Sequence, residues 1–116
     1  MRTFYILRVG GASREDVARV LGIASTSDMG YWECELKEGA SDPPIPFVER
    51  FTALLAGKFE ALEKVGVSRD DINVRVLYEY DEQCNLEFPP QDLRLLGQAG
   101  IGLCVSCWQG VSTEQG

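Results

Sequence analysis

The sequence contains no histidine among its 116 residues. Histidine is the usual base of serine and cysteine hydrolases and a frequent zinc ligand. Its absence excludes Ser-His-Asp and Cys-His hydrolysis and every zinc site that uses a histidine. Long apolar runs are missing too, since none approaches the roughly 18 residues that a transmembrane helix needs. The opening residues 1–8 are too short and too interrupted to form the core of a signal peptide.

Positive charge is scarce. Lys and Arg number 11 against 18 Asp and Glu, which gives a formal net charge of −7. A net negative charge repels the phosphate backbone of nucleic acids and the surface of anionic membranes, so we expect neither nucleic acid nor a membrane as a partner. Negative charge favours a basic protein partner and speeds the encounter with it, although it also serves simply to keep a small protein soluble.

What remains is the composition of an ordinary globular chain, 45% hydrophobic and 25% charged. A chain of this length buries roughly two-thirds of its unfolded surface, so it needs neither a disulfide nor a metal to fold. We predict a single domain over residues 1–116, with a frayed polar tail over 110–116. We expect a cytoplasmic protein with reduced cysteines. The sequence leaves open whether the four cysteines come together: Cys34, Cys84, Cys104 and Cys107.

Apolar patterning predicts eight elements in the order β-α-β-α-β-β-α-β. Runs and alternations of apolar residues predict strands over 3–9, 31–36, 72–80, 84–88 and 101–107. Helical spacing predicts helices over 14–21, 47–65 and 90–96. Ser13 is the expected N-cap of the first helix and Gly22 its C-cap. The segment 37–46 carries three prolines and is the clearest connector.

This order predicts an α+β fold. The strand–helix–strand units near 3–36 and 84–108 are expected to hold their strands parallel, because short crossovers usually do so. Residues 72–88 are expected to form an antiparallel hairpin. The prediction is a two-layer mixed sheet of about five strands with helices on one face, loosely ferredoxin-like.

Two features that resemble binding motifs are better explained by structure. The apolar stripe over 47–65 is interpreted as the core face of a helix rather than a cofactor lining. Gly10-Gly11 follows a strand, but its spacing fits no phosphate-binding pattern, and Glu15 and Asp16 would repel a phosphate. A tight turn is the better account of the two glycines.

Cys104-Val105-Ser106-Cys107 is a CxxC motif. It lies within a predicted strand, which sends the two cysteine side chains to opposite faces, whereas a redox pair needs a helix N-terminus. Zinc binding would require the fold to gather all four cysteines. Buried cysteine acting as a small apolar residue is therefore the favoured interpretation. No cofactor or metal is expected.

The candidate functional residues are charged and aromatic side chains on predicted strands. Glu33 and Glu35 share one strand face, where two carboxylates could serve glycoside hydrolysis or hold Mg²⁺ or Ca²⁺. A solvated polar face is the commoner explanation. We predict that this face docks a basic protein, with these residues: Tyr31, Glu33, Glu35, Arg75, Glu79 and Glu87. Trp32 is expected in the core, while Trp108 could lie in the core or at the surface.

Several segments carry a family resemblance: EDVARVLGI (15–23), GYW (30–32), NLEF (85–88) and QDLRLLGQAGIGLCVSCW (91–108). On these the chain resembles a bacterial family catalogued as domain of unknown function 4279. These motifs mark the ends of helices and strands rather than a catalytic site, and the resemblance implies no activity or catalytic residue. Small bacterial proteins of this kind are often suspected of inhibiting toxins. That expectation rests on analogy with the type of protein and not on residues of this sequence.

The leading functional hypothesis is a non-enzymatic protein-binding domain, an immunity-type inhibitor of a basic toxin. The first alternative is a small-ligand or carboxylate-dependent enzyme site in the groove between sheet and helices. The second is a homo-oligomeric structural module that associates through an unpaired sheet edge or exposed aromatic residues.

Overall fold

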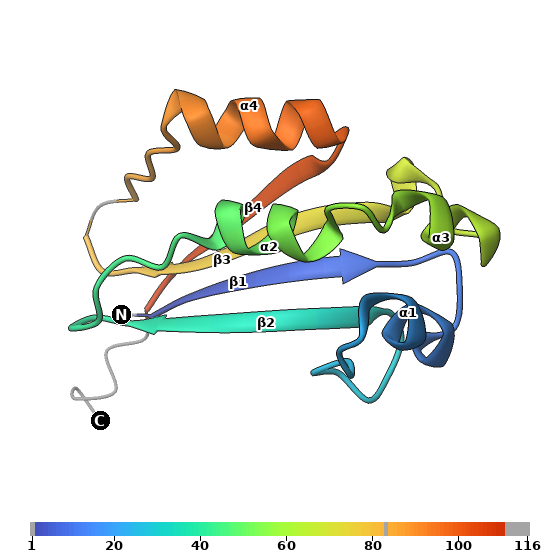
Figure 1. Cartoon of the computed structure of the whole chain (residues 1–116). Helices are drawn as coiled ribbons and strands as arrows, with labels where there is room; N and C mark the ends of the chain where they lie inside the picture. The colour runs from blue at the N-terminus through green and yellow to red at the C-terminus, as the bar shows by residue number, and fades with distance from the viewer. Residues whose placement is uncertain (1, 83, 111–116) are drawn as a thin grey trace.

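The computed structural model describes residues 2–82 and 84–110. Four strands form one sheet of order β2-β1-β3-β4 (Figure 1). The strands are β1 (Arg2–Val9), β2 (Trp32–Gly39), β3 (Ile72–Tyr80) and β4 (Gly102–Gln109). β1 pairs antiparallel with β2 and with β3, whereas β3 and β4 are parallel. The predicted α+β class and the mixed character of the sheet are therefore confirmed.

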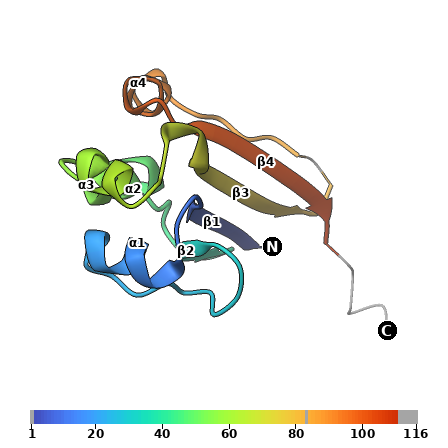
Figure 2. The same cartoon turned by 90° about the vertical axis from the view of Figure 1, so that its right-hand side faces the viewer.

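The helices all lie on one side of this sheet (Figure 2). They are α1 (Arg14–Leu21), α2 (Phe47–Leu55), α3 (Phe59–Lys64) and α4 (Pro90–Ala99), and a 3-10 turn, η1 (Arg69–Asp71), precedes β3. The opposite face of the sheet is left without a helix by the described residues. The predicted arrangement of two layers, with helices on one face, is confirmed.

Helix α1 begins and ends where its caps predict. The Ser13 hydroxyl accepts a hydrogen bond from the Asp16 N–H at 3.1 Å, and Gly22 takes the left-handed conformation after the last turn. Val17 and Leu21 face the core. Local sequence was sufficient here because a cap and an apolar stripe act within a few residues.

The predicted continuous helix over 47–65 is wrong. The chain breaks between α2 and α3 at Ala56–Lys58, where Gly57 has φ +75°. Glycine adopts this left-handed backbone conformation at little cost, and the chain changes direction between α2 and α3. Both pieces keep their predicted inner face, since Phe51, Leu55 and Leu62 are almost fully buried.

The predicted hairpin and its fifth strand are also wrong. β3 is flanked by β1 and β4, so neither of its edges is free to pair with residues 84–88. These residues instead run toward α4, and Leu86 and Phe88 pack against the core. Gly110, the one described residue of the predicted tail, donates from its N–H to the Tyr80 carbonyl at 2.6 Å. Residues 111–116 lie outside the described residues.

The first strand–helix–strand unit is antiparallel, which contradicts the prediction and the ferredoxin-like topology. α1 has 8 residues, as does β1. The helix spans about 12 Å and the strand about 26 Å, so α1 does not carry the chain back to the start of β1. The longer connection from β3 through residues 81–89 and α4 does cover that distance, and β3 and β4 are parallel.

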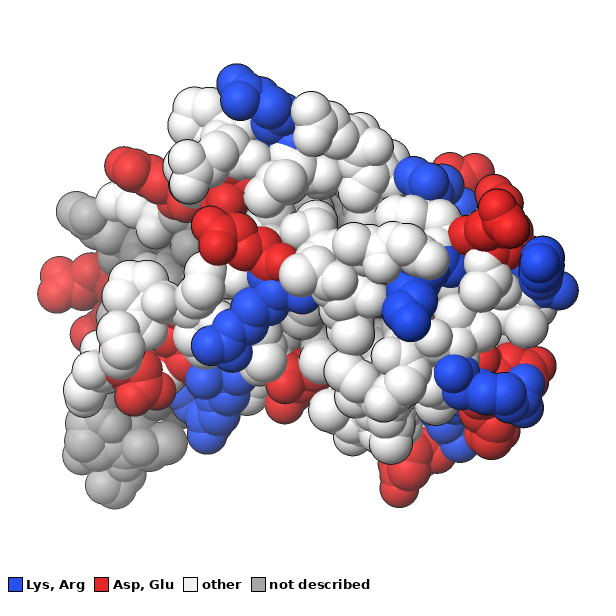
Figure 3. All heavy atoms as spheres, in the orientation of Figure 1, with Lys and Arg blue, Asp and Glu red and all other residues white. Residues whose placement is uncertain are grey.

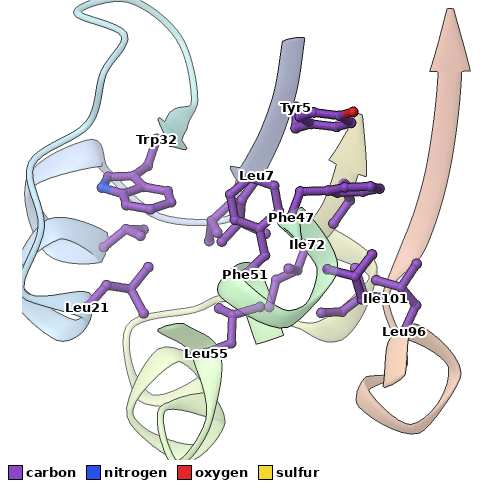
Figure 4. Close-up of a cluster of buried hydrophobic side chains, with 14 of the residues drawn as sticks. Tyr5, Leu7, Leu21, Trp32, Phe47, Phe51, Leu55, Ile72, Leu96 and Ile101 are labelled. Carbon is purple, nitrogen blue, oxygen red and sulfur yellow. The ribbon is translucent and has the colours of Figure 1, made fainter. Parts of the chain in front are cut away.

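The core fills the space between the sheet and the helices (Figure 4). Trp32 is 0% exposed, and its indole N–H donates to the Ile23 carbonyl at 3.0 Å, so its burial strands no polar group. The prediction that Trp32 is a core residue is confirmed. Tyr5 stacks on Phe47 at 4.2 Å between ring centroids and ties β1 to α2. Core residues come from one side of β1–β3, which leaves the other side for solvent.

Candidate functional site

Five of the six predicted binding residues belong to β2, β3 or the residue before β2, and these strands present an uncovered face. We call this surface the open sheet face and define it by the outward residues of the four strands: Arg2, Phe4, Ile6, Arg8, Glu33, Glu35, Lys37, Asn73, Arg75, Leu77, Glu79, Cys104, Ser106 and Trp108. The register runs straight across it. Glu35, Ile6 and Arg75 are successive partners in one row.

Ion pairs neutralise part of this face. Arg8 Nε donates to Glu33 Oε2 at 2.8 Å, and both side chains are mostly buried. Arg2 Nε approaches Glu79 Oε1 at 3.2 Å across β1 and β3. The face therefore carries interspersed charges of both signs, and two of the predicted carboxylates, Glu33 and Glu79, are paired with arginines of β1. Glu35 is exposed and forms no ion pair within the described chain.

Two aromatic residues stand at opposite corners of the open sheet face. Tyr31 is 54% exposed beside the start of β2, and the Arg8 guanidinium lies 5.0 Å from its ring centroid. Trp108 is 36% exposed near the end of β4, opposite Glu79 in the register. The question that the sequence left open for Trp108 is thereby answered: it lies at the surface.

A small hollow of about 150 Å³ lies beside Tyr31. Its lining includes Arg8, Asp70 and Asn73. The Asn73 side-chain oxygen is buried without a hydrogen-bond partner among the described residues. An unsatisfied buried acceptor is costly, so a donor supplied by a partner would be favourable there.

The Gly10-Gly11 turn closes one side of this hollow. Gly10 N–H donates to the Asp71 carbonyl at 2.9 Å, and Gly11 has φ +85°. A β-carbon on Gly11 would lie 2.5 Å from Asp71 Oδ2. Close approach to η1 therefore accounts for the glycine, in agreement with the tight turn expected from the sequence.

Glu87 does not join the other predicted residues. It precedes α4 in the segment that was predicted to be a strand, on the helix side of the molecule, and it lines a different hollow. The cause is the missing hairpin, since only pairing between 84–88 and β3 would have brought Glu87 near Arg75 and Glu79.

That second hollow is a groove that sequence reasoning did not predict. It has a volume of about 330 Å³. We call it the proline groove and define it by its lining: Tyr5, Pro44, Ile45, Pro46, Phe47, Glu49, Glu87, Pro89, Gln91 and Asp92. Carboxylates (red) lie between the starts of α4 and α2 in the space-filling view (Figure 3). Its walls are two proline-rich segments that precede these helices, more than 40 residues apart in the chain.

A partly buried pair of hydrogen bonds lies beside the proline groove. Glu38 Oε1 accepts from the Tyr5 hydroxyl at 3.1 Å and from the Ile45 N–H at 2.9 Å. Burial raises the pKa of Tyr5 above its usual value, and the neighbouring Glu38 carboxylate raises it further. The only sequence signal for this groove was indirect, namely that both proline pairs stand near acidic residues.

The cysteines do not gather into one site. Cys104 lies opposite Arg75 and Cys107 opposite Tyr78, so the CxxC side chains point to opposite faces, as predicted. Their predicted burial is wrong, because both are exposed. Cys107 shares a hydrogen bond with Cys84, which raises the pKa of the Cys107 thiol. Burial raises the pKa of Cys34. Across residues 2–82 and 84–110, no group of three or more His, Cys, Asp or Glu side chains is arranged to hold a metal ion.

Comparisons with protein-family models, curated proteins and solved structures found no match for this chain. The resemblance to the family of unknown function therefore stays a prediction. In the part of the chain that the structure describes, no helix has the length and the apolar character that crossing a membrane requires.

Proposed function

We propose that this chain is a protein-binding domain that docks its partner on the open sheet face. The observation that carries the proposal is a four-stranded sheet with all its helices on one side, while the other side holds apolar side chains between ion pairs. Phe4 and Leu77 are half-buried there and lose further water when a partner covers them.

The composition of the face supports recognition by a protein. Trp, Tyr and Arg are the residues most enriched at the energetic centres of protein interfaces. Trp108, Tyr31 and three arginines belong to this surface or its rim. The arginine at position 8 is already held by Glu33 and by the Tyr31 ring, so little conformational entropy is lost when a partner contacts it.

The proposed partner has a basic surface, and the narrower form of the proposal is an immunity-type inhibitor of a basic toxin. The formal net charge of −7 supports this chemistry. Glu35 is the carboxylate best suited to meet a partner's Lys or Arg, because it is exposed and has no ion pair of its own among the described residues. Attraction between net charges would mainly speed association and weaken as salt rises.

The first test compares capture of partners from the native cells by three versions of the tagged protein. These are the wild type, the double variant Tyr31→Ala/Trp108→Ala, and the control Leu93→Ala, which changes an exposed apolar residue on α4. We expect a basic protein that the wild type and L93A retain and the double variant loses.

The captured protein is then purified and titrated against the wild type and Glu35→Gln. We expect slower association for E35Q and a smaller salt dependence, with affinity lower by about two- to fivefold. Equal retention by all three baits would overturn the assignment to this face. Circular dichroism spectra and melting temperatures of the baits show whether any loss reflects misfolding.

One observation supports a homo-oligomeric module as the second candidate. β4 is an edge strand, and Val105 and Trp108 are exposed on it. Exposed apolar edges invite pairing with a second copy. Sedimentation velocity over a hundredfold range of concentration tests this candidate: a dimer that Val105→Lys converts to monomer would support it, and a constant monomer mass would eliminate it.

A further inference from the structure

The proline groove differs from the open sheet face in its charge. It is lined by Glu49, Glu87 and Asp92 and by no Lys or Arg. None of these three carboxylates forms an ion pair or a side-chain hydrogen bond with a described residue. The groove is therefore a concentrated negative patch whose three carboxylates have no ion-pair partner among residues 2–82 and 84–110.

Helix stabilisation explains only part of this charge. Glu49 and Asp92 lie in the first turns of α2 and α4, where the helix dipole stabilises a carboxylate. Glu87 lies three residues before α4. It is outside the first turn of either helix, so the helix dipole does not account for its carboxylate. Its position beside the other two raises their mutual repulsion, a cost that a bound cation would remove.

The groove has more hydrogen-bond acceptors than donors, and Gln91 contributes a side-chain amide that can do both. Pro44, Pro46 and Pro89 have no N–H to offer, while their carbonyls and the three carboxylates accept hydrogen bonds. The Tyr5 hydroxyl and the Ile45 N–H both donate to Glu38 and are already engaged. A guanidinium group, with five N–H donors and a positive charge, is the side chain that best complements such a surface.

The walls also offer apolar contacts along a length of chain. Proline rings and Ile45 flank the groove, and the buried Tyr5–Phe47 stack forms its floor. A neighbouring hollow of about 660 Å³ shares Glu87 and Pro89 with the proline groove and continues it along residues 87–90. Small molecules usually bind where 70–90% of their surface is covered, roughly speaking, and this open trough does not enclose one. An extended peptide gains its contacts through length instead.

We propose that the proline groove binds a short basic peptide segment, with an arginine among the three carboxylates and apolar neighbours against the prolines. This site goes beyond the proposed docking on the open sheet face and does not depend on it, since the groove lies on the helix side of the sheet.

The test uses synthetic peptides and amide NMR spectra of the full chain labelled with nitrogen-15. The probe is an acetylated and amidated pentapeptide with an arginine between two leucines. Two matched peptides carry citrulline, which is neutral and nearly isosteric, or glutamate in place of the arginine. We expect saturable shifts at residues 45–49 and 87–93 with the arginine peptide. Affinity should fall at least about fivefold with citrulline, and binding should be absent with glutamate.

Variants then locate the charge. We expect Glu87→Gln and Asp92→Asn each to weaken the arginine peptide about two- to fivefold and the double variant about tenfold. The control Glu60→Gln neutralises an exposed carboxylate on α3 and should leave the affinity unchanged. Trp108→Ala should also leave it unchanged, which separates this site from the open sheet face.

Three results would overturn the proposal. The first is the absence of saturable shifts, and the second is equal affinity for the arginine and citrulline peptides. The third is equal affinity for free arginine amide and for the pentapeptide, which would identify a site for a small organic cation instead. Failure of these titrations would leave the capture experiment on the open sheet face unaffected, so the two proposals stand or fall separately.

Discussion

The two faces of the sheet are built from alternate residues of the same strands, and they have opposite properties. On the helix side, Leu7 and Val74 are 0% exposed and belong to one continuous core. On the open side, Leu77 is half-buried and 28% of the Arg8 side chain is exposed. The helix-side core residues of β1, β2 and β3 lie beneath the helices, whereas the open side of the sheet has no helix over it.

Ile6 marks the limit of this contrast. It belongs to the open side, yet only 6% of its surface is exposed, because charged side chains flank it on both neighbouring strands. Long polar side chains therefore cover apolar surface without a second layer of structure. The helix side therefore contributes most of the buried apolar surface that stabilises the fold, and the open side contributes less.

The largest expected effect separates the two faces directly. Leu7→Ala should lower the free energy of unfolding by about 3 to 4 kcal/mol, since it opens a cavity in the core. Phe4 lies three residues earlier on β1, on the open side. Phe4→Ala should lower the free energy of unfolding by about 1 kcal/mol. Urea denaturation followed by circular dichroism measures both values. Equal losses for the two variants would break the comparison.

The cysteines give the second prediction, because Cys104 and Cys107 point to different faces. Cysteines three apart in a strand are about 10 Å apart, beyond the roughly 7 Å that a disulfide spans. Cys84 is the hydrogen-bond partner of Cys107. Hydrogen peroxide should therefore join Cys84 to Cys107: the two thiols give up two protons and two electrons, and the peroxide is reduced to water. The bond should stabilise the fold by about 2 to 3 kcal/mol.

Peptide mapping of the oxidised protein identifies the partner of Cys107. Cys104→Ser should still form the disulfide, and Cys84→Ser should not. A disulfide that involves Cys104 would contradict the assignment of the two faces.

Tyr5 provides a smaller, pH-dependent effect on the helix side. Tyr5→Phe keeps the stack on Phe47 but removes the hydrogen bond to Glu38, at a cost of about 1 kcal/mol. The pKa of Tyr5 is raised by folding. Its contribution is therefore complete below the unfolded pKa of about 10 and is lost as the pH rises above it.

Denaturation at several pH values checks this sign. The difference in unfolding free energy between wild type and Y5F should be constant from neutral pH to about pH 9 and shrink above about pH 10. A difference that grows with pH would contradict the buried, protonated Tyr5.

The smallest effect belongs to the ion pair of the open side. A double-mutant cycle with Arg8→Ala and Glu33→Ala should give a coupling of about 0.5 to 1 kcal/mol, because both groups keep contact with water. The coupling should decrease in high salt. A coupling above about 3 kcal/mol would show that this pair is sealed as tightly as the core and would erase the difference between the faces.

Short-range features of this fold were predictable from the sequence. The caps of α1, the inner face of α2 and the alternation of β3 all depend on residues within one or two turns of each other. The placement of Trp32 in the core and of Tyr31 outside it also followed from the period of two in a strand. The predicted neighbours Glu33 and Glu35 share a face for the same reason.

Long-range features were not predictable in this way. The sequence pattern of 84–88 fits a strand, but β4 occupies the edge of β3 that this strand needed. The loss of that strand moved Glu87 from the open sheet face to the proline groove. Nor did the pattern show that Arg8 and Arg2 would neutralise two of the predicted carboxylates, because these pairs join strands 25 and 77 residues apart.

The sequence by itself determined four of the five predicted strands, the caps of α1 and the apolar side of α1 and α2, since periodicity and caps act locally. Only the tertiary structure decided which strands are neighbours, which carboxylates are neutralised and where two distant proline segments form a groove. The physical reason is competition. A sheet edge, a charged side chain or an apolar surface each has several possible partners, and the lengths of the connections and the packing select among them.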